Sequence, residues 1–347
     1  MFARSLPRLA VSLFLGSFAV CTAARACTIP VFRYALDRWE SDRFRLLLPQ
    51  ETAAQPTMVD LLRPLRAGGR ANLDIQTDRA GRVTVPTLYF PGHETTPVWS
   101  GRMDAPALAA LLDSPAREEI RRHILSGSSV IWVLVDAATP AEDATAERIR
   151  RRLAFLEQAA ALPIQDPNDP DSQLGPGPPL KLQFQTLRLR LGDPAEGPLL
   201  AMLAGPEKRV DASKPFAAAV FGRGRVLGSW PLSALDDAAL EDACMFLIGR
   251  CSCRVKNQNP GWDILMEVDW EGRLRQASQG AVTSATVSAS APAAAPPPPA
   301  PPALPEVTRI QPPESPPAAE ASSRRPWLVG AGAAVLLLAL VLWLRPS

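Results

Sequence analysis

The chain has 347 residues, which is long enough for two domains of ordinary size. Lysine and arginine number 37 and aspartate and glutamate 35, so the formal net charge is only +2, and this balance argues against a nucleic-acid-binding protein. The 37 prolines are about twice the usual frequency of roughly 5%, and they cluster, so they mark particular segments of the chain.

Residues 1–26 have the features of a secretory signal peptide. Two arginines lie near the start, residues 9–20 form a short apolar core, and the segment ends in the small-x-small sequence ARA. We therefore predict cleavage before Cys27 and a folded body on the extracytoplasmic side of the membrane. The alternative is a lipoprotein whose lipid is attached to Cys27, although Arg25 fits that signal poorly.

Between residues 27 and 276, strand-like and helix-like patterns alternate, which predicts an α/β fold. In the first half we expect, in chain order, a helix at 31–39, a strand at 44–50, a helix at 56–68, a strand at 71–78, paired strands at 83–90 and 97–103, and a long helix at 104–125 with Asp104 as its N-cap. In the second half we expect a strand at 129–137, a helix at 141–160, a solvated Pro/Asp-rich loop at 165–179, a strand at 180–191, a hairpin at 216–230 and a helix at 234–249.

The C-terminal part has a different composition. Residues 277–326 are rich in proline and alanine, which predicts a disordered linker that holds the folded body away from the membrane. Residues 327–344 carry no charge, and a helix of this length spans about 27 Å, close to the roughly 30 Å of a hydrocarbon core. We predict a single transmembrane helix here and a location in the cell membrane. The alternative is a sorting tail that processing removes.

Two stretches of the predicted body share one pattern. "PTLYFPGHETTPVWSGRMDAPALAALLDS" and "PFAAAVFGRGRVLGSWPLSALDDAALEDA" each contain a strand, a glycine turn, a strand with a tryptophan, and a helix that starts at an aspartate. Together with the preceding strand, helix and strand, each resembles the thioredoxin fold. The run "VPTLYF" is similar to the thioredoxin segment in which a cis-proline begins a strand. The resemblance implies two tandem thioredoxin-like units, at 27–128 and 129–276, with Pro86 as a cis-proline.

Thioredoxin chemistry requires a Cys-x-x-Cys motif where the first core strand meets the next helix, because the helix N-terminus favours the thiolate. The corresponding junctions here read "LLLPQETAAQPTMVD" and "VLVDAATPAEDATAE", and neither contains a cysteine. Both units are therefore expected to be degenerate scaffolds. The opening "CTIPVFRYALDRW" and the phrase "CSCRVKNQNPG" also resemble an uncharacterised family of exported, membrane-anchored bacterial proteins, a resemblance that implies no particular activity.

Four cysteines remain after the predicted cleavage: Cys27, Cys244, Cys251 and Cys253. An even number in an oxidising compartment favours disulfides. Three pairings are open, and we expect Cys27 to join one member of the CSC pair. One alternative is a redox-active Cys251–Cys253 pair, whose thiolates the flanking arginines would stabilise. Another is capture of a soft metal such as Cu(I) by Cys244, Cys251 and Cys253.

Other polar residues indicate no catalytic site. The two histidines, His93 and His123, are far apart in sequence, so a hydrolase triad has no support. Asp263, Glu267 and Asp269 alternate as they would on one face of a strand, but paired carboxylates need a cleft that the sequence does not show. No cofactor is expected.

Two functional classes remain open. The first is a non-enzymatic, exported and membrane-anchored scaffold or interaction module that contacts a membrane or envelope protein and uses residues 327–344 as its anchor. The second is an envelope thiol–disulfide redox or copper-handling protein that uses the CSC motif.

Overall fold

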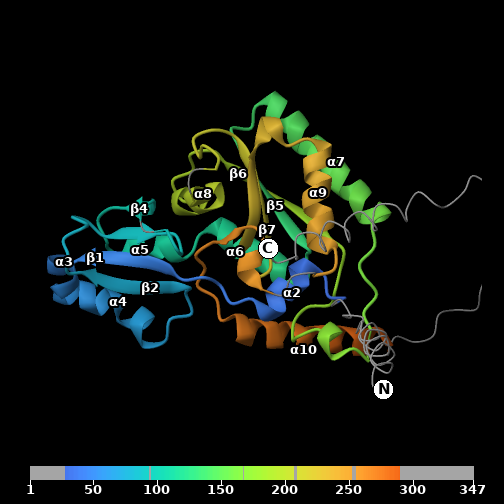
Figure 1. The fold of residues 1–347 in the computed structure, drawn as a ribbon, viewed down its shortest axis with the longest axis horizontal. Coiled ribbons are helices and arrows are strands. Elements are labelled where there is room, and N and C mark those ends of the chain that lie inside the picture. The colour runs from blue at the N-terminus through green and yellow to red at the C-terminus, as the bar shows by residue number, and fades with distance from the viewer. Residues whose placement is uncertain (1–27, 94, 167, 207–208, 252–254, 290–347) are drawn as a thin grey trace, which may run out of the picture. The chain divides into compact units, whose positions relative to one another are not determined.

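The computed structural model describes residues 28–93, 95–166, 168–206, 209–251 and 255–289. These residues belong to one compact unit with two mixed sheets and surrounding helices (Figure 1), so the predicted α/β class is confirmed. None of the helices in this part of the chain has both the length and the apolar character needed to cross a bilayer. The predicted signal peptide and the predicted transmembrane helix at 327–344 lie outside the described residues.

The first sheet has the strand order β2-β1-β3-β4. The first two strands are parallel, and the last two continue the sheet as an antiparallel hairpin. Two helices, α3 and α4, connect the parallel strands, and α5 and α6 follow the hairpin. The bounds are β1 Phe44–Pro49, α3 Gln50–Ala54, α4 Pro56–Gly68, β2 Leu73–Asp78, β3 Thr87–Tyr89, β4 Pro97–Ser100, α5 Ala105–Leu112 and α6 Pro115–Leu125.

The second sheet has the order β6-β5-β7-β8-β9, with β5 and β6 parallel and the others antiparallel. The bounds are β5 Val130–Asp136, α7 Pro140–Ala159, β6 Phe184–Arg190, α8 Gly197–Ala204, β7 Phe216–Phe221, β8 Arg225–Pro231, α9 Asp237–Ile248 and β9 Trp262–Asp263. The predicted hairpin turn requires glycine, because Gly224 has φ +86° and a Cβ there would lie 2.6 Å from Met266 Sδ. Apart from β9, this sheet repeats the strand order of the first.

The predicted helix at 104–125 is two helices. Asp104 caps α5 by accepting the Ala107 N–H (3.0 Å), as expected. Ser114 then caps a new helix, because its Oγ accepts the Arg117 N–H (3.4 Å) and Pro115 occupies the first helical position. Proline lacks the N–H that a continuous helix would need, whereas it suits a first turn. The Ser-Pro pair was the local signal for this break.

The end of the described chain also differs from expectation. Helix α10 spans Trp270–Ala289 and therefore continues through residues 277–289, which the sequence analysis assigned to the disordered linker. Trp270 and Leu274 are buried and anchor its first turns. Asp269 accepts the Gly272 N–H (2.9 Å), which satisfies one of the free donors at the helix start. The predicted strand around Asp263 is reduced to the two residues of β9.

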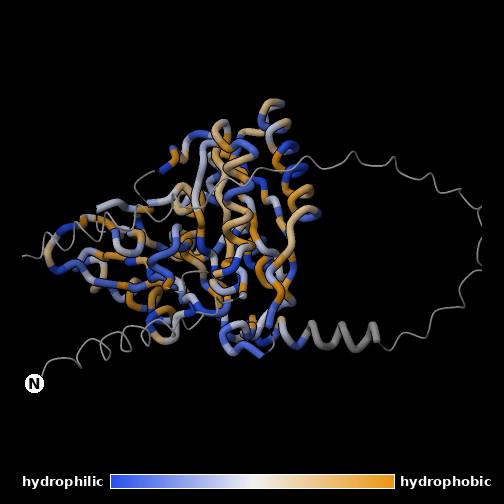
Figure 2. Tube along the Cα trace, turned by 45° about the vertical axis from the view of Figure 1, so that its right-hand side comes forward, coloured by the Kyte–Doolittle hydropathy of each residue, from blue (hydrophilic) through white to orange (hydrophobic). Residues whose placement is uncertain are grey.

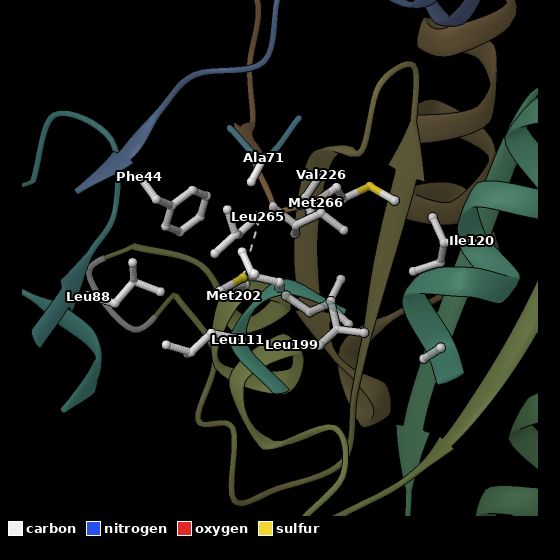
Figure 3. Close-up of a cluster of buried hydrophobic side chains, with 14 of the residues drawn as sticks. Phe44, Ala71, Leu88, Leu111, Ile120, Leu199, Met202, Val226, Leu265 and Met266 are labelled. Carbon is white, nitrogen blue, oxygen red and sulfur yellow. Dashed lines mark hydrogen bonds between the residues drawn. The ribbon is translucent and has the colours of Figure 1, made fainter. Parts of the chain in front are cut away.

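Two hydrophobic clusters hold the body together. The larger one contains side chains of both sheets and of α4, α5, α6 and α8, and Figure 3 shows Phe44 and Leu88 of the first sheet near Met202 of α8. The Leu265 N–H donates to Met202 Sδ (3.4 Å) inside it. The smaller cluster lies on the other face of the second sheet, around Trp132, under α7 and α9. Figure 2 shows hydrophobic stretches mainly inside the body and mixed hydropathy along its outer helices.

The segments near the two ends of the described body each pack against the sheet that is farther from them in sequence. Helix α2 (Val31–Arg38) precedes the first sheet but packs in the smaller cluster against the second. Conversely, Met266, which follows the second sheet, exchanges hydrogen bonds with Asn72, directly before β2 of the first: its N–H donates to Asn72 Oδ1 (2.8 Å), and its carbonyl accepts the Asn72 N–H (3.3 Å). Packing is therefore continuous across the expected domain boundary between residues 128 and 129.

The Pro/Asp-rich loop at 165–179 is held against the body, contrary to the expectation of a solvated excursion. Asp169 and Ser172 are buried, and Ser172 Oγ accepts the Thr28 N–H (3.2 Å). Arg33 of α2 donates to the carbonyl of Gly175 (2.7 Å). The prolines restrict the backbone of this segment, and its carbonyl oxygens accept hydrogen bonds from the buried Arg33.

Candidate functional site

Cys244 lies on the inward face of α9 and is fully buried in the smaller cluster. Its thiol is free, so the predicted disulfide role of Cys244 is not realised in the structure. Burial raises the pKa of the Cys244 thiol to about 12. The thiol is therefore protonated at neutral pH, whereas redox chemistry and soft-metal binding use the thiolate.

Cys251 is buried in the segment that follows α9, next to the start of the described chain. Its backbone N–H donates to the Ile29 carbonyl (3.0 Å), and Pro30 forms an antiparallel bridge with Arg250. Ile29 and Pro30, which come shortly after the predicted cleavage site, thus lie beside Arg250 and Cys251. This contact brings together two regions that the sequence separates by more than two hundred residues.

Cys27 and Cys253 lie outside the described residues. A disulfide between Cys27 and the CSC motif, a reactive Cys251–Cys253 pair and lipidation of Cys27 therefore stay predictions. Within the residues that the structure describes, no three histidine, cysteine or acidic side chains form a group able to hold a metal ion. The proposed trio of Cys244, Cys251 and Cys253 has only two members in that part of the chain.

The prediction of a cis peptide bond at Pro86 is wrong. No cis bond occurs among the described residues, so the Val85–Pro86 bond is trans, which is the default for an X–Pro bond. Pro86 is nevertheless buried directly before β3, and its carbonyl accepts the Gly101 N–H (3.1 Å). Thr87 Oγ1 donates to the Val85 carbonyl (2.9 Å) and supports the extended backbone here. The resemblance thus pointed to a proline that is buried in the structure, but the cis isomer that it implied is wrong.

A cavity of about 640 Å³ lies beside Pro86, where α4 begins and where α5 begins. We call it the Pro86 groove. Hydroxyl and amide side chains, apolar side chains and one pair of opposite charges line it: Thr52, Gln55, Thr57 and Thr84; Met58, Leu61, Val85 and Met103; Arg102 and Asp104. This lining offers hydrogen-bonding groups and an apolar floor, and it contains no thiol. Its volume falls in the range of ligand and peptide-binding clefts.

The corresponding junction of the second sheet, after β5, is occupied by an ion-pair network. Arg188 Nε lies 2.9 and 2.8 Å from the two carboxylate oxygens of Asp136, and Arg188 Nη1 lies 2.6 Å from Asp143. Hydrogen bonding to Asp136, and then to Asp143, raises the pKa of Arg188 further. Ala138 adopts φ +57°, a left-handed conformation that is uncommon outside glycine. Charged side chains therefore occupy this junction, and it contains no thiol.

The carboxylates near the C-terminus do not form a catalytic pair. Asp263 is buried, with Arg225 Nη1 3.2 Å from its Oδ1 and Lys256 in contact with its other oxygen. Burial raises the pKa of Asp263, and Lys256 opposes that effect. Glu267 and Asp269 are exposed. The expected common polar face is absent because only β9 is a strand.

The Pro86 groove and the Arg188 network were not predicted from the sequence. Both are formed by segments that meet only in the folded chain. The sequence signal near them was the absence of a cysteine at the junctions after β1 and β5. Comparison with known proteins adds no relative, because neither a protein-family model nor a curated protein matches the chain.

Proposed function

We propose that this protein is a non-enzymatic, exported and membrane-anchored interaction module built from two degenerate thioredoxin-like units. The shared strand order of the two sheets supports this assignment, since each has a parallel strand pair followed by an antiparallel hairpin and a helix. The likeness is one of architecture, and function is argued from the sites.

The chemistry at the two junctions supports a non-enzymatic role. In the first unit the chain after β1 supplies threonines and a glutamine, and in the second an arginine neutralises the acids after β5. Cys244, with its raised pKa, is not a nucleophile at neutral pH.

The Pro86 groove is the observation that carries the proposal. It combines the buried Met58 and Met103 with exposed polar side chains, a lining suited to an extended segment of a partner protein. Export and anchoring rest on the predicted signal peptide and on the apolar segment at 327–344. On this basis the partner is an envelope or membrane protein.

Site-specific photocrosslinking tests the proposal. A photoreactive amino acid at Gln55, which lines the groove, should capture one discrete envelope protein in cells. The same amino acid at Arg63, exposed elsewhere on α4, is the matched control and should not. A Thr57→Trp change that fills the groove should abolish capture, whereas Arg63→Trp should not. Equal capture from both positions, or capture that survives Thr57→Trp, would contradict the proposal.

A second measurement separates the proposal from thiol chemistry. The purified protein should not catalyse reduction of a dithiol-dependent reporter such as insulin. Turnover that disappears in a Cys251→Ser variant would favour the redox alternative instead.

A further inference from the structure

One face of the first sheet carries no covering helix among the described residues. Every side chain of β1 to β4 that belongs to a hydrophobic cluster belongs to the larger one, and the smaller cluster contains none of them. In the second sheet, by contrast, all residues of β5 are buried and both faces are covered. The difference lies in the connections between strands along the chain. Helix α8 lies between β6 and β7 in the second sheet, whereas only a loop connects β2 to β3 in the first.

This face carries polar side chains at the end near Arg43 and Arg45, whereas Leu47, farther along β1 on the same side, is buried, and we call it the open face. Because successive strand residues point to opposite sides, the inward Phe44 and Leu46 place Arg45 on the open face, together with Arg43. Asp74 of β2 is the register partner of Arg45 on one side. Tyr89 of β3 is its partner on the other, with the Arg45 guanidinium 5.1 Å from the Tyr89 ring centre.

A hollow of about 490 Å³ lies over this face. Strand side chains form one wall and the turn after β3 forms the other: Arg43, Arg45, Asp74, Gln76, Phe90, Pro91, Gly92 and His93. Arg43 donates to the Leu73 carbonyl (3.0 Å), and Gln76 donates to Asp74 (2.7 Å). These hydrogen bonds hold the polar groups around the hollow in defined positions.

The charges in the hollow suit an anion. Among the described residues that line the hollow, Arg43 directly before β1 and Arg45 on β1 lie two residues apart, which is roughly 6.6 Å along the chain, and the carboxylate of Asp74 opposes them. Guanidinium groups match the geometry of carboxylate and phosphate oxygens and can bind them with two parallel hydrogen bonds. Gln76 and His93 add further hydrogen-bonding groups to the wall.

We infer that the open face binds a small soluble molecule with carboxylate or phosphate groups, held by Arg43 and Arg45. A concave hollow of this size fits a compact ligand. The site is separate from the Pro86 groove, because the two cavities share no lining residue. Ligand binding at the open face therefore does not depend on the proposed interaction function.

Calorimetric titration of the full-length protein in a non-ionic detergent at low salt tests this inference. The probes are citrate, which carries carboxylates, and inorganic pyrophosphate, which carries phosphates. Arg45→Gln should weaken binding of the preferred probe at least tenfold. Arg63→Gln, an exposed arginine on α4, is the matched control and should leave binding unchanged.

Asp74→Asn gives a result that damage to the fold cannot imitate. Removing the opposing carboxylate should strengthen binding of the same probe severalfold, because repulsion of the anion is lost. Failure of both probes to bind the wild-type protein would overturn the inference. So would an unchanged or weaker affinity in Asp74→Asn, or an equal loss in Arg63→Gln.

Discussion

Arg33 is expected to be one of the most important polar side chains for the stability of the folded body. It is buried, and its guanidinium donates to Asp37 Oδ1 (2.9 Å), to the Gly175 carbonyl (2.7 Å) and to the Pro178 carbonyl. An Arg33→Met variant keeps most of the aliphatic stem but leaves the Asp37 carboxylate with the Gly175 N–H (2.8 Å) and only the weaker electrostatic influence of Arg38. Removing one partner of a buried pair costs about 3–5 kcal/mol, and we expect a loss of unfolding free energy in this range.

The loss should depend on pH. Burial raises the pKa of Asp37 above 3.8, and Arg33 opposes this rise. A raised folded-state pKa means that Asp37 contributes stability below its unfolded pKa and loses that contribution as the pH rises through the folded pKa. Without Arg33 the folded pKa rises further. The deficit of Arg33→Met relative to wild type should therefore be largest at neutral pH and shrink toward about pH 4.

Urea denaturation of both proteins at neutral and acid pH measures the two effects. Arg38→Met is the matched control, since Arg38 lies on the same helix but makes an exposed hydrogen bond to the Gln173 carbonyl (3.2 Å). It should change stability by less than about 0.5 kcal/mol. An Arg33→Met/Asp37→Leu double variant should be more stable than Arg33→Met. A loss below about 1 kcal/mol in Arg33→Met, or a deficit that grows on acidification, would refute the reasoning.

Three further outcomes are expected. Pro30 and Arg250 are antiparallel partners, and in the sequence Cys27 precedes Pro30 by as many residues as Cys253 follows Arg250, so peptide mapping without reductant should recover Cys27 and Cys253 as one cross-linked pair; a different partner for Cys27 would contradict this. The buried thiol of Cys244 should resist alkylation at neutral pH until urea unfolds the protein, and rapid native labelling would show it to be accessible. Glu142→Gln should destabilise the protein at neutral pH but much less below about pH 4.5, because hydrogen bonds from Thr139 lower the pKa of Glu142 and their contribution is lost as the pH falls; a pH-independent difference in melting temperature would exclude this role.

The helices and strands of the body were largely predictable, because their signals are local. Alternation marked β6, the continuous apolar run marked β5, and the amphipathic pattern marked α7, whose capping box of Thr139 and Glu142 the structure adds. Helix α8 is short and apolar throughout, so its sequence carries no periodic pattern. Helix α10 was missed because its Ser- and Ala-rich part has the composition of a linker, and the sequence does not show that Trp270 and Leu274 are buried.

The sequence by itself also determined that neither junction can support thioredoxin chemistry, since a missing cysteine needs no structure to be noticed. Only the tertiary structure decided which groups are buried and with what partners. Arg33 and Pro178 are 145 positions apart, and nothing near either residue shows that they meet. The open face and the protonated state of Cys244 are decided in the same way, because burial depends on the packing of distant segments and not on local periodicity.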